Sequence, residues 1–275
     1  MADRTEGVRA KNWSGTAAPY SRSFAHLCAG TITPLLAAVG EAIGGLDGKN
    51  LLDVGCGTGA LAGQASRLGA RVTAVDPDPE MLDLARRTVP RAIFSAGGVP
   101  DLPFEQGTFQ AVTANFVVNH VDDPRSAATD LTRVCAPGGA VGVTVWPSTP
   151  SAMNALWAEV ITASGALAPP PDHLPADKDF ERTRDGLTQL LTEAGVSHVR
   201  TRVLSWEFRI PPEDLWAGPA GGVAGIGKIV SSQTPSMQAA MKGHYEGLVS
   251  PLMDNGEVVL PAESLMAVGI REAFT

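Results

Sequence analysis

The stretch LLDVGCGTGALA, residues 51–62, restricts the possible folds more than any other part of the chain. An apolar run ends at Asp53, three glycines follow at Gly55, Gly57 and Gly59, and a helix-forming pattern begins directly after them. Glycine supplies the backbone freedom that a strand-to-helix turn needs, and it lets a ligand approach the main chain closely. We therefore expect a buried strand, a ligand-binding loop and a helix in succession.

The alternation of strand and helix continues up to residue 146. Apolar strand patterns are separated by amphipathic helices that begin near proline and acids or end near glycine. The five strand patterns are NLLDVG, RVTAVD, RAIFSAG, TFQAVTANFVV and AVGVTVW. A sixth strand is expected at VSHVRTRVLSWEFRI, and one last strand or two short ones at EVVLPAESLMAVGIRE. This order predicts an α/β fold with a Rossmann-like, doubly wound and mostly parallel sheet of seven strands.

Composition narrows the possible partners and the cellular setting. The net charge is −8, and no basic run appears, whereas nucleic-acid binding needs clustered Lys and Arg. We therefore expect no nucleic-acid partner. The three cysteines lack metal-ligand spacing, which favours free thiols and a cytoplasmic location. We find no apolar run long enough to span a bilayer, and a helical pattern over residues 23–44 is expected to break at Pro34.

Asp53 separates the two classes of cofactor that use a glycine loop of this kind. The spacing Gly55-x-Gly57-x-x-Ala60 loosely fits the pyrophosphate-binding loop of dinucleotide enzymes. A carboxylate two residues before the first glycine would repel a pyrophosphate, but it suits a ligand with an ammonium group. S-adenosylmethionine carries an ammonium and a sulfonium and no phosphate. The loop therefore favours S-adenosylmethionine, and an NAD-dependent dehydrogenase stays as an alternative.

Several linked segments resemble the class I S-adenosylmethionine-dependent methyltransferases. LLDVGCGTG is similar to motif I of that family, and Asp76 closes VTAVD at the distance where an acid binds ribose hydroxyls. PDPEML matches the adenine-side helix, and DLPFEQGTFQAV resembles the LPF…FDAV segment. NHVDDPRSAATDLTRVCAPGG resembles the HHVxDPxxALxExxRVLxPGG run of the subgroup that methylates small molecules and quinones. The resemblance is strong over residues 20–146 and continues weakly to VVLPAESLMAVGIR.

The resemblance assigns cofactor contacts position by position. Asp53 and the backbone of the glycine loop would hold the methionine part, Asp76 would bind the ribose hydroxyls, and Asn115 would lie near the methionine moiety. Tyr20 falls where the N-terminal helix of the family often closes over the cofactor. The full set of implied cofactor-binding residues is Tyr20, Asp53, Gly55, Cys56, Gly57, Asp76, Pro77, Met81, Gly98, Val99 and Asn115, with Pro77 and Met81 flanking the adenine.

Two positions depart from the family pattern. Gly98 stands where the family usually has an acid that accepts a hydrogen bond from the adenine amino group. Its loss removes one hydrogen bond, about 1 kcal/mol, although the backbone at Val99 could serve instead. Gln110 replaces the Asp of FDAV, and we expect this change to alter the structure at the sheet edge more than the chemistry.

The chain is expected to divide into a core and two caps. Residues 1–146 would hold N-terminal cap helices and the cofactor-binding core, and residues 147–180 would form a cap or lid. Residues 181–275 would complete the sheet and carry a second cap segment at 211–250. A hydroxyl acceptor needs a base, for which His120 is the first candidate because it follows the fourth strand. Packing or capping of the next helix is an equally good interpretation of His120.

The acceptor pocket is expected to be aromatic and free of metal. Its candidate residues are Phe24, Trp146, His173, Trp216 and His244, and the two histidines are also alternative bases. Trp146 ends the fifth strand and is the favoured wall, whereas Trp206 is expected in the core. The adjacent acids Asp122 and Asp123 precede a proline, so they are expected to cap a helix rather than to bind a metal.

These observations lead to one functional hypothesis with two alternatives. The protein would transfer a methyl group from S-adenosylmethionine to a small, fairly apolar molecule, with oxygen favoured over carbon or nitrogen as the acceptor atom. Specialised-metabolite biosynthesis is the expected setting, and the protein would act as a monomer or homodimer. The same fold could instead bind S-adenosylmethionine and catalyse a non-methylating cyclisation or rearrangement. The second alternative is the NAD-dependent dehydrogenase.

Overall fold

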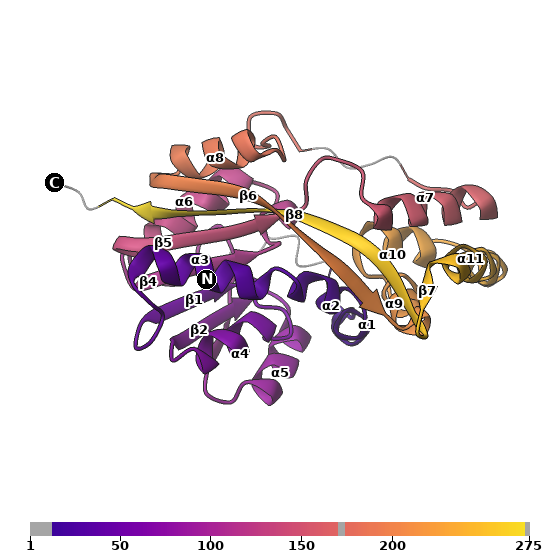
Figure 1. Ribbon diagram of the computed structural model, residues 1–275, viewed down its shortest axis with the longest axis horizontal. Coiled ribbons are helices and arrows are strands. Elements are labelled where there is room, and N and C mark those ends of the chain that lie inside the picture. The colour runs from indigo at the N-terminus through magenta and orange to yellow at the C-terminus, as the bar shows by residue number, and fades with distance from the viewer. Residues whose placement is uncertain (1–12, 170–173, 273–275) are drawn as a thin grey trace, which may run out of the picture.

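The computed structural model describes residues 13–169 and 174–272, which form a central sheet covered by helices on both faces (Figure 1). The strands are β1 (Asn50–Val54), β2 (Arg71–Asp76), β3 (Ile93–Ala96), β4 (Phe109–Asn115), β5 (Cys135–Val145), β6 (Val196–Ile210), β7 (Met253–Asp254) and β8 (Glu257–Arg271). Their spatial order is β3-β2-β1-β4-β5-β8-β6, and the two-residue β7 pairs with β8. Strands β1 to β5 pair in parallel, and β8 runs antiparallel to β5 and β6. The Rossmann-like α/β fold is confirmed.

The helices form two layers against this sheet and a third group at one end. They are α1 (Ala17–Arg22), α2 (Phe24–Ala29), α3 (Ile32–Ile43), α4 (Ala60–Arg67), α5 (Pro79–Thr88), η2 (Val118–His120), α6 (Pro124–Val134), α7 (Ala152–Ser164), α8 (Arg184–Glu193), α9 (Pro212–Ala220), α10 (Ala224–Ser231), α11 (Pro235–Val249) and η3 (Ser250–Leu252). One apolar core joins the sheet to α3, α4 and α5, and a second core joins its other face to α6 and α8.

Acidic side chains start the two helices that frame the expected binding edge. Asp78 accepts a hydrogen bond from the Met81 amide at the beginning of α5, at 3.0 Å. Asp123 accepts from the Ser126 amide at the beginning of α6, at 2.9 Å, so its carboxylate caps the helix as expected. Within residues 13–169 and 174–272 no group of three or more His, Cys, Asp or Glu side chains is placed to hold a metal ion.

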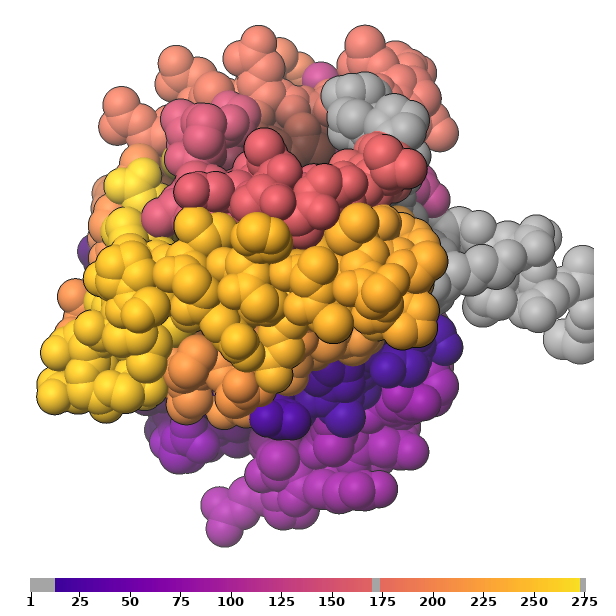
Figure 2. All heavy atoms as spheres, turned by 90° about the vertical axis from the view of Figure 1, so that its right-hand side faces the viewer, coloured from indigo at the N-terminus to yellow at the C-terminus, as the bar shows by residue number. Residues whose placement is uncertain are grey.

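The third group of helices covers one end of two long strands. β6 and β8 are each 15 residues long and extend past the core sheet, where α7, α9, α10 and α11 pack on them (Figure 1). Figure 2 shows these helices covering that end of the molecule, with the N-terminal helices directly beneath them. A third apolar core fills this region and includes Trp157, Trp216, Tyr245 and Phe208. Each segment that we expected to form a cap therefore contributes helices here, α7 from the first segment and α9, α10 and α11 from the second.

Three features differ from the sequence-based expectation. The N-terminal helix breaks at Gly30 and Thr31, because Pro34 falls in the first turn of α3, where an amide has no helical partner. β5 begins at Cys135, five residues earlier than expected, through a bulge against β4. The last pattern forms one continuous strand, β8, which is one of the two forms that we expected. Gln110 lies in β4, inside the sheet rather than at its edge, and its side chain accepts from the Asn50 amide at 3.0 Å.

The N-terminal helical segment also corrects an expectation about membranes. Residues Phe24–Ile43 are long and apolar enough to span a bilayer by length and composition, although we found no such run in the sequence. In the structure the second half of this segment is α3, whose Leu35, Leu36 and Val39 are fully buried against the sheet. Core helices of globular domains meet the same criterion, so this segment alone is weak evidence for a membrane span.

The close packing of α3 on β5 requires a glycine at position 142, and this requirement can be tested. A Cβ at Gly142 would lie 2.5 Å from Val39 Cγ2 and 2.9 Å from Leu35 Cδ1. We expect Gly142→Val to lower the free energy of unfolding by about 1–3 kcal/mol, because overpacking forces α3 away from the sheet. Urea denaturation measures this change. Gly243→Val in α11 is the matched control, since nothing lies within 4 Å of its Cβ, and an equal loss there would contradict the packing argument.

Candidate active site

The loop after β1 adopts a conformation that only glycine accommodates without strain. Gly55 and Gly57 have φ values of 64° and 51°. A Cβ at Gly55 would lie 2.5 Å from Val117 Cγ2, and a Cβ at Gly57 would lie 3.5 Å from the Tyr20 ring. The loop is therefore enclosed between the turn after β4 and helix α1, and its bare main chain forms the floor of a cavity.

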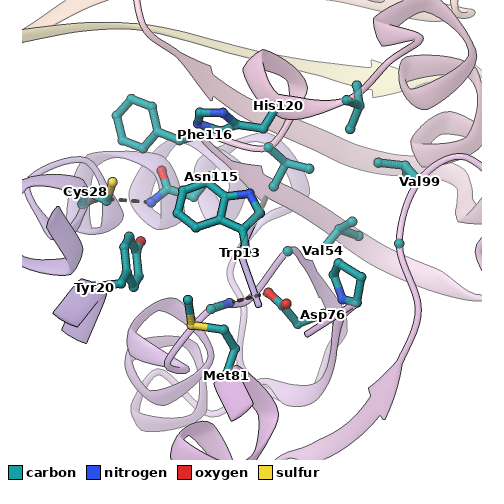
Figure 3. A pocket seen from close by; sticks show the side chains of 16 residues that line it. Trp13, Tyr20, Cys28, Val54, Asp76, Met81, Val99, Asn115, Phe116 and His120 are labelled. Carbon is teal, nitrogen blue, oxygen red and sulfur yellow. Dashed lines mark hydrogen bonds between the residues drawn. The ribbon is translucent and has the colours of Figure 1, made fainter. Parts of the chain in front are cut away.

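A cavity of about 120 Å³ lies over this loop, at the carboxyl ends of β1, β2 and β4 (Figure 3). The structure brings ten of the expected residues to its walls: Tyr20, Gly55, Gly57, Asp76, Pro77, Met81, Gly98, Val99, Asn115 and His120. Asp53 and Cys56 line an adjoining hollow of about 40 Å³, which shares Tyr20, Gly55 and Asn115 with the cavity. All of the residues assigned to the cofactor therefore border one continuous region.

Asp76 joins the ends of two strands at the cavity wall. Its Oδ2 accepts from the Gly57 amide at 2.8 Å, and its Oδ1 accepts from the Asp78 amide at 2.9 Å (Figure 3). Burial raises the pKa of this carboxyl to about 6, and the two amide hydrogen bonds partly offset that rise. Asp76 is therefore largely ionised at neutral pH and faces a cavity that can receive hydroxyl donors.

Asp53 is the more strained acid because one of its oxygens has no partner. Its Oδ2 is buried without a hydrogen bond, and its Oδ1 receives only a long contact of 3.5 Å from Thr113 Oγ1. Burial raises the pKa of Asp53 to about 8, and the nearby main chain at Ala62 lowers it only in part. A buried acid with an unpaired oxygen fits a ligand that brings a positive charge, such as the ammonium of a methionine moiety.

Helices α1 and α2 supply the roof of the cavity. Tyr20 lies over Gly57, and burial together with the neighbouring Cys28 raises the pKa of its phenol well above the usual value. Burial raises the pKa of the Cys28 thiol to about 12, so both groups are neutral at physiological pH. Two uncharged side chains therefore lie above Asp76, which is largely ionised, and the cavity has a net negative potential.

Asn115 fastens this roof to the sheet. Its Oδ1 accepts from Thr31 Oγ1 at 2.7 Å and from Thr144 Oγ1 at 2.6 Å, and its Nδ2 donates to the Cys28 carbonyl at 3.2 Å. Thr31 follows α2, and Thr144 lies in β5. The amide therefore links the end of β4 to the helices above it, in addition to bordering the region expected for the methionine moiety.

A second and larger cavity, of about 460 Å³, lies between the first cavity and the cap helices. It shares four residues with the first: Trp13, Tyr20, Cys28 and His120. Phe24 and Trp146, which we expected in the acceptor pocket, line it, as do Trp157 of α7 and Phe208 of β6. A volume of this size falls in the range of small-molecule sites.

Two expected acceptor residues, Trp216 and His244, do not line this cavity. Trp216 is not among its walls, because it packs inside the cap core, 5.2 Å from the Tyr245 ring between centroids. His244 is exposed on α11, next to Tyr245, whose side chain faces the cap core. Trp216 and His244 are therefore wrong as pocket residues. His173 lies outside the described residues.

Several wall residues were missed by sequence reasoning. Trp13 and Cys28 line both cavities, and Phe116, Val117 and Val121 line the first. Trp13 precedes any periodic pattern in the sequence. Phe116 adopts a φ of 58°, so its side-chain direction could not be inferred from the alternation of the strand pattern. Phe208, Leu260 and Ala262 lie in β6 and β8, and the alternation of apolar residues in those strands could have identified them.

The charges of the walls separate the classes of possible ligand. Among the described residues, no Lys or Arg lines either cavity or the adjoining hollow. A pyrophosphate needs cationic or helix-terminal partners and would approach Asp53 and Asp76 here. The arrangement instead favours a cationic ligand on the glycine loop. The second cavity is lined by one acid, Glu263, and by no described Lys or Arg, which favours a molecule without negative charge there.

Comparison with known proteins agrees with this geometry. A family described as "Methyltransferase domain" matches residues 52–143. The ubiquinone biosynthesis O-methyltransferase of Xanthomonas oryzae pv. oryzae is 38% identical over 112 residues, which cover 39% of this chain and 47% of that protein. The demethylmenaquinone methyltransferase of Renibacterium salmoninarum is 36% identical over 99 residues, which cover 36% of this chain and 42% of that protein. The chain thus spans less than half the length of these curated relatives.

Solved structures extend the similarity in fold to most of the chain. The YcgJ protein of Bacillus subtilis superposes with a TM-score of 0.55 at 17% identity, covering 88% of this chain and 100% of that one. Phosphoethanolamine N-methyltransferase 2 of Haemonchus contortus, solved with S-adenosylhomocysteine, gives a TM-score of 0.51 at 15% identity and covers 86% of this chain and 52% of that one. Residues 52–143 are thus similar to a methyltransferase domain family, and the solved structures share the fold of this chain over most of its length.

Proposed function

We propose that the protein transfers the methyl group of S-adenosylmethionine to a small, largely apolar acceptor held in the 460 Å³ cavity. The observation that carries this proposal is the shared wall: Trp13, Tyr20, Cys28 and His120 border the cofactor region and the larger cavity at once. A donor and an acceptor bound in the two spaces would meet at these four side chains. The quinone O-methyltransferase relative and the apolar walls support an oxygen acceptor on a small molecule.

The proposed roles of the cofactor residues follow from their surroundings. Asp53 would pair its free oxygen with the ammonium group, and Asp76 would accept from the ribose hydroxyls. Met81 and Pro77 border the side of the cavity next to Asp76, where the adenine would lie, and Val99 offers its backbone there. When bound, S-adenosylmethionine supplies an electrophilic methyl group on a sulfonium. The chain itself holds the acceptor in line and excludes water with its aromatic walls.

His120 is the proposed base for a hydroxyl acceptor. Its ring borders both cavities, and the ring of Trp13 meets it edge to face with centroids 5.3 Å apart. Its main-chain amide donates to the Val117 carbonyl at 2.8 Å, which holds the short turn after β4. A histidine at this junction can take the acceptor's proton as the oxygen–carbon bond forms.

We also propose that the acceptor is not a nucleic acid and that the setting is specialised metabolism.

Binding and turnover can be measured separately. Calorimetric titration should show that S-adenosylmethionine and S-adenosylhomocysteine bind and that NAD does not. Asp76→Ala should weaken the binding of S-adenosylhomocysteine at least tenfold, because about one to two charge-assisted hydrogen bonds are lost. Neutral phenols and quinols, such as catechol and 2-methylhydroquinone, then serve as acceptors in an assay of S-adenosylhomocysteine release. Binding of NAD alone would refute the proposal, and binding without release for any acceptor would favour the non-methylating alternative.

The pKa of Asp53 predicts how cofactor affinity changes with pH. In the free protein this carboxyl has a pKa of about 8, and an ammonium ligand requires it to be ionised. Binding therefore releases a proton below pH 8, and the affinity for S-adenosylhomocysteine should rise by up to about tenfold per pH unit from pH 6.5 to 8. Asp53→Asn should bind weakly and lose this dependence. Calorimetry in buffers of different ionisation enthalpy measures the proton release directly.

Asp53→Asn, which should weaken cofactor binding, should stabilise the free protein at pH 8. Because the folded pKa of Asp53 is raised above its unfolded value of about 3.9, its ionisation destabilises the fold as the pH rises towards 8. Asn cannot ionise, so Asp53→Asn should raise the melting temperature at pH 8 and change it little at pH 4. A variant that is destabilised at both pH values would contradict the assignment of a protonated, buried acid.

The role of His120 is tested by His120→Gln. We expect kcat for a phenol acceptor to fall by about 10²–10⁴, because the variant has no base at the junction, while the affinity for S-adenosylhomocysteine stays within twofold. The acidic limb of the pH–rate profile should disappear with it. An unchanged rate and profile would assign His120 to packing against Trp13 instead.

A further inference from the structure

Asn119 lies in η2, between Val118 and His120, and its side chain reaches the end of the neighbouring strand. The Trp146 amide donates to Asn119 Oδ1 at 2.8 Å, and Asn119 Nδ2 makes a longer contact of 3.5 Å with the Trp146 carbonyl. Trp146 directly follows the last residue of β5. One side-chain amide therefore engages both main-chain polar groups of Trp146 and ties the turn after β4 to the end of β5.

The residue that Asn119 holds is part of the wall between the two cavities. The Trp146 ring stacks on the Phe116 ring, with centroids 3.9 Å apart and planes within 17°. Phe116 lines the cofactor cavity and Trp146 lines the acceptor cavity. Phe116 has a φ of 58°, which a phenylalanine keeps only when its surroundings hold it, and Thr144 receives its amide hydrogen bond.

The residue that follows Asn119 is the proposed base. η2 spans only three residues, Val118–His120, and no side chain caps its start. The side chain of Val118 is fully buried in the core below, and the Asn119 amide attaches the turn to β5 above it. His120, which follows these two residues, faces the cofactor cavity (Figure 3) and also lines the acceptor cavity.

We propose that Asn119 is a positioning residue for the methyl transfer, a role that rests on the proposed function. Its two contacts with the Trp146 main chain, which we call the clamp, fix the position of the His120 ring relative to the stacked Phe116 and Trp146 rings. These groups lie where the donor and the acceptor would meet. Asn119 touches neither ligand itself, and it is not among the residues that line the cavities. The 2.8 Å bond to Oδ1 is the stronger half of the clamp, because 3.5 Å is long for a hydrogen bond.

The unequal bonds provide a matched pair of variants. Asn119→Asp keeps the acceptor for the Trp146 amide, and Asn119→Leu has a similar volume but removes it. The first readout is the ¹³C-labelled histidine NMR spectrum of the ligand-free protein, in which the His120 signal is identified by its loss in His120→Gln. Asn119→Leu should shift or broaden that signal, because the ring leaves its place against Trp13, and Asn119→Asp should restore it towards the wild-type position.

The second readout is kinetic and uses a phenol that wild type methylates in the acceptor assay. Asn119→Leu should lower kcat by about 10- to 100-fold and alter the acidic limb of the pH–rate profile. The KM for S-adenosylmethionine should stay within twofold, and Asn119→Asp should recover most of the rate. Displacement of His120 and of the Phe116–Trp146 wall would lower kcat and leave the KM for S-adenosylmethionine unchanged. A general loss of structure would weaken cofactor binding as well.

Three outcomes would overturn the inference. One is an unchanged His120 signal in Asn119→Leu, which would mean that other contacts hold the turn. Another is a parallel loss of melting temperature, cofactor affinity and rate, which would make Asn119 a general support of the fold. The third is an Asn119→Asp variant as impaired as Asn119→Leu. A wild-type protein that does not bind S-adenosylhomocysteine would defeat the proposed function instead, and the NMR comparison would still decide whether the clamp exists.

Discussion

The hydrogen bond from the Gly57 amide to Asp76 Oδ2 is the contact on which the site depends most. It joins the loop after β1 to the end of β2, and it fixes the glycine floor relative to the acid that faces the cavity. Because Gly57 also lies against the Tyr20 ring, the position of the floor determines where the roof can close. A shift in this one bond would move the floor, the acid and the roof together.

Burial of Asp53 shows that the binding site is built at the expense of stability. An unpaired carboxylate oxygen in the interior is unfavourable, and the pKa of about 8 is the measure of that cost in the free protein. A ligand that brings a positive charge relieves it and gains affinity from the relief. The absence of Lys and Arg from the described walls keeps the region selective for such a ligand, because no internal cation competes for the acid.

The cofactor roof and the acceptor cap are fastened to each other as well as to the core. Arg22 at the end of α1 forms an ion pair with Asp214 of α9 at 2.6 Å. The exposed pair itself contributes little, but two glycines of this region allow close packing next to it. A Cβ at Gly218 would lie 2.6 Å from Ser23 Oγ, and one at Gly221 would meet Pro19. The same helices thereby connect the walls of the two cavities.

The sequence predicted the core of the fold and which residues gather over the glycine loop, and the reason is that both depend on local patterns. Strand and helix periods, the glycine spacing and the positions of Asp53 and Asp76 each lie within one continuous segment. The acceptor side could not be predicted in the same way, because it is assembled from helices and strands that are far apart in the chain. For this reason Trp216 and His244 were wrongly assigned to the acceptor pocket. The packing of α9 and α11 against α7 decides which of their side chains face the cavity. Asn119 shows the same limit, since its partner Trp146 is 27 residues away and only the paired ends of β4 and β5 bring them together.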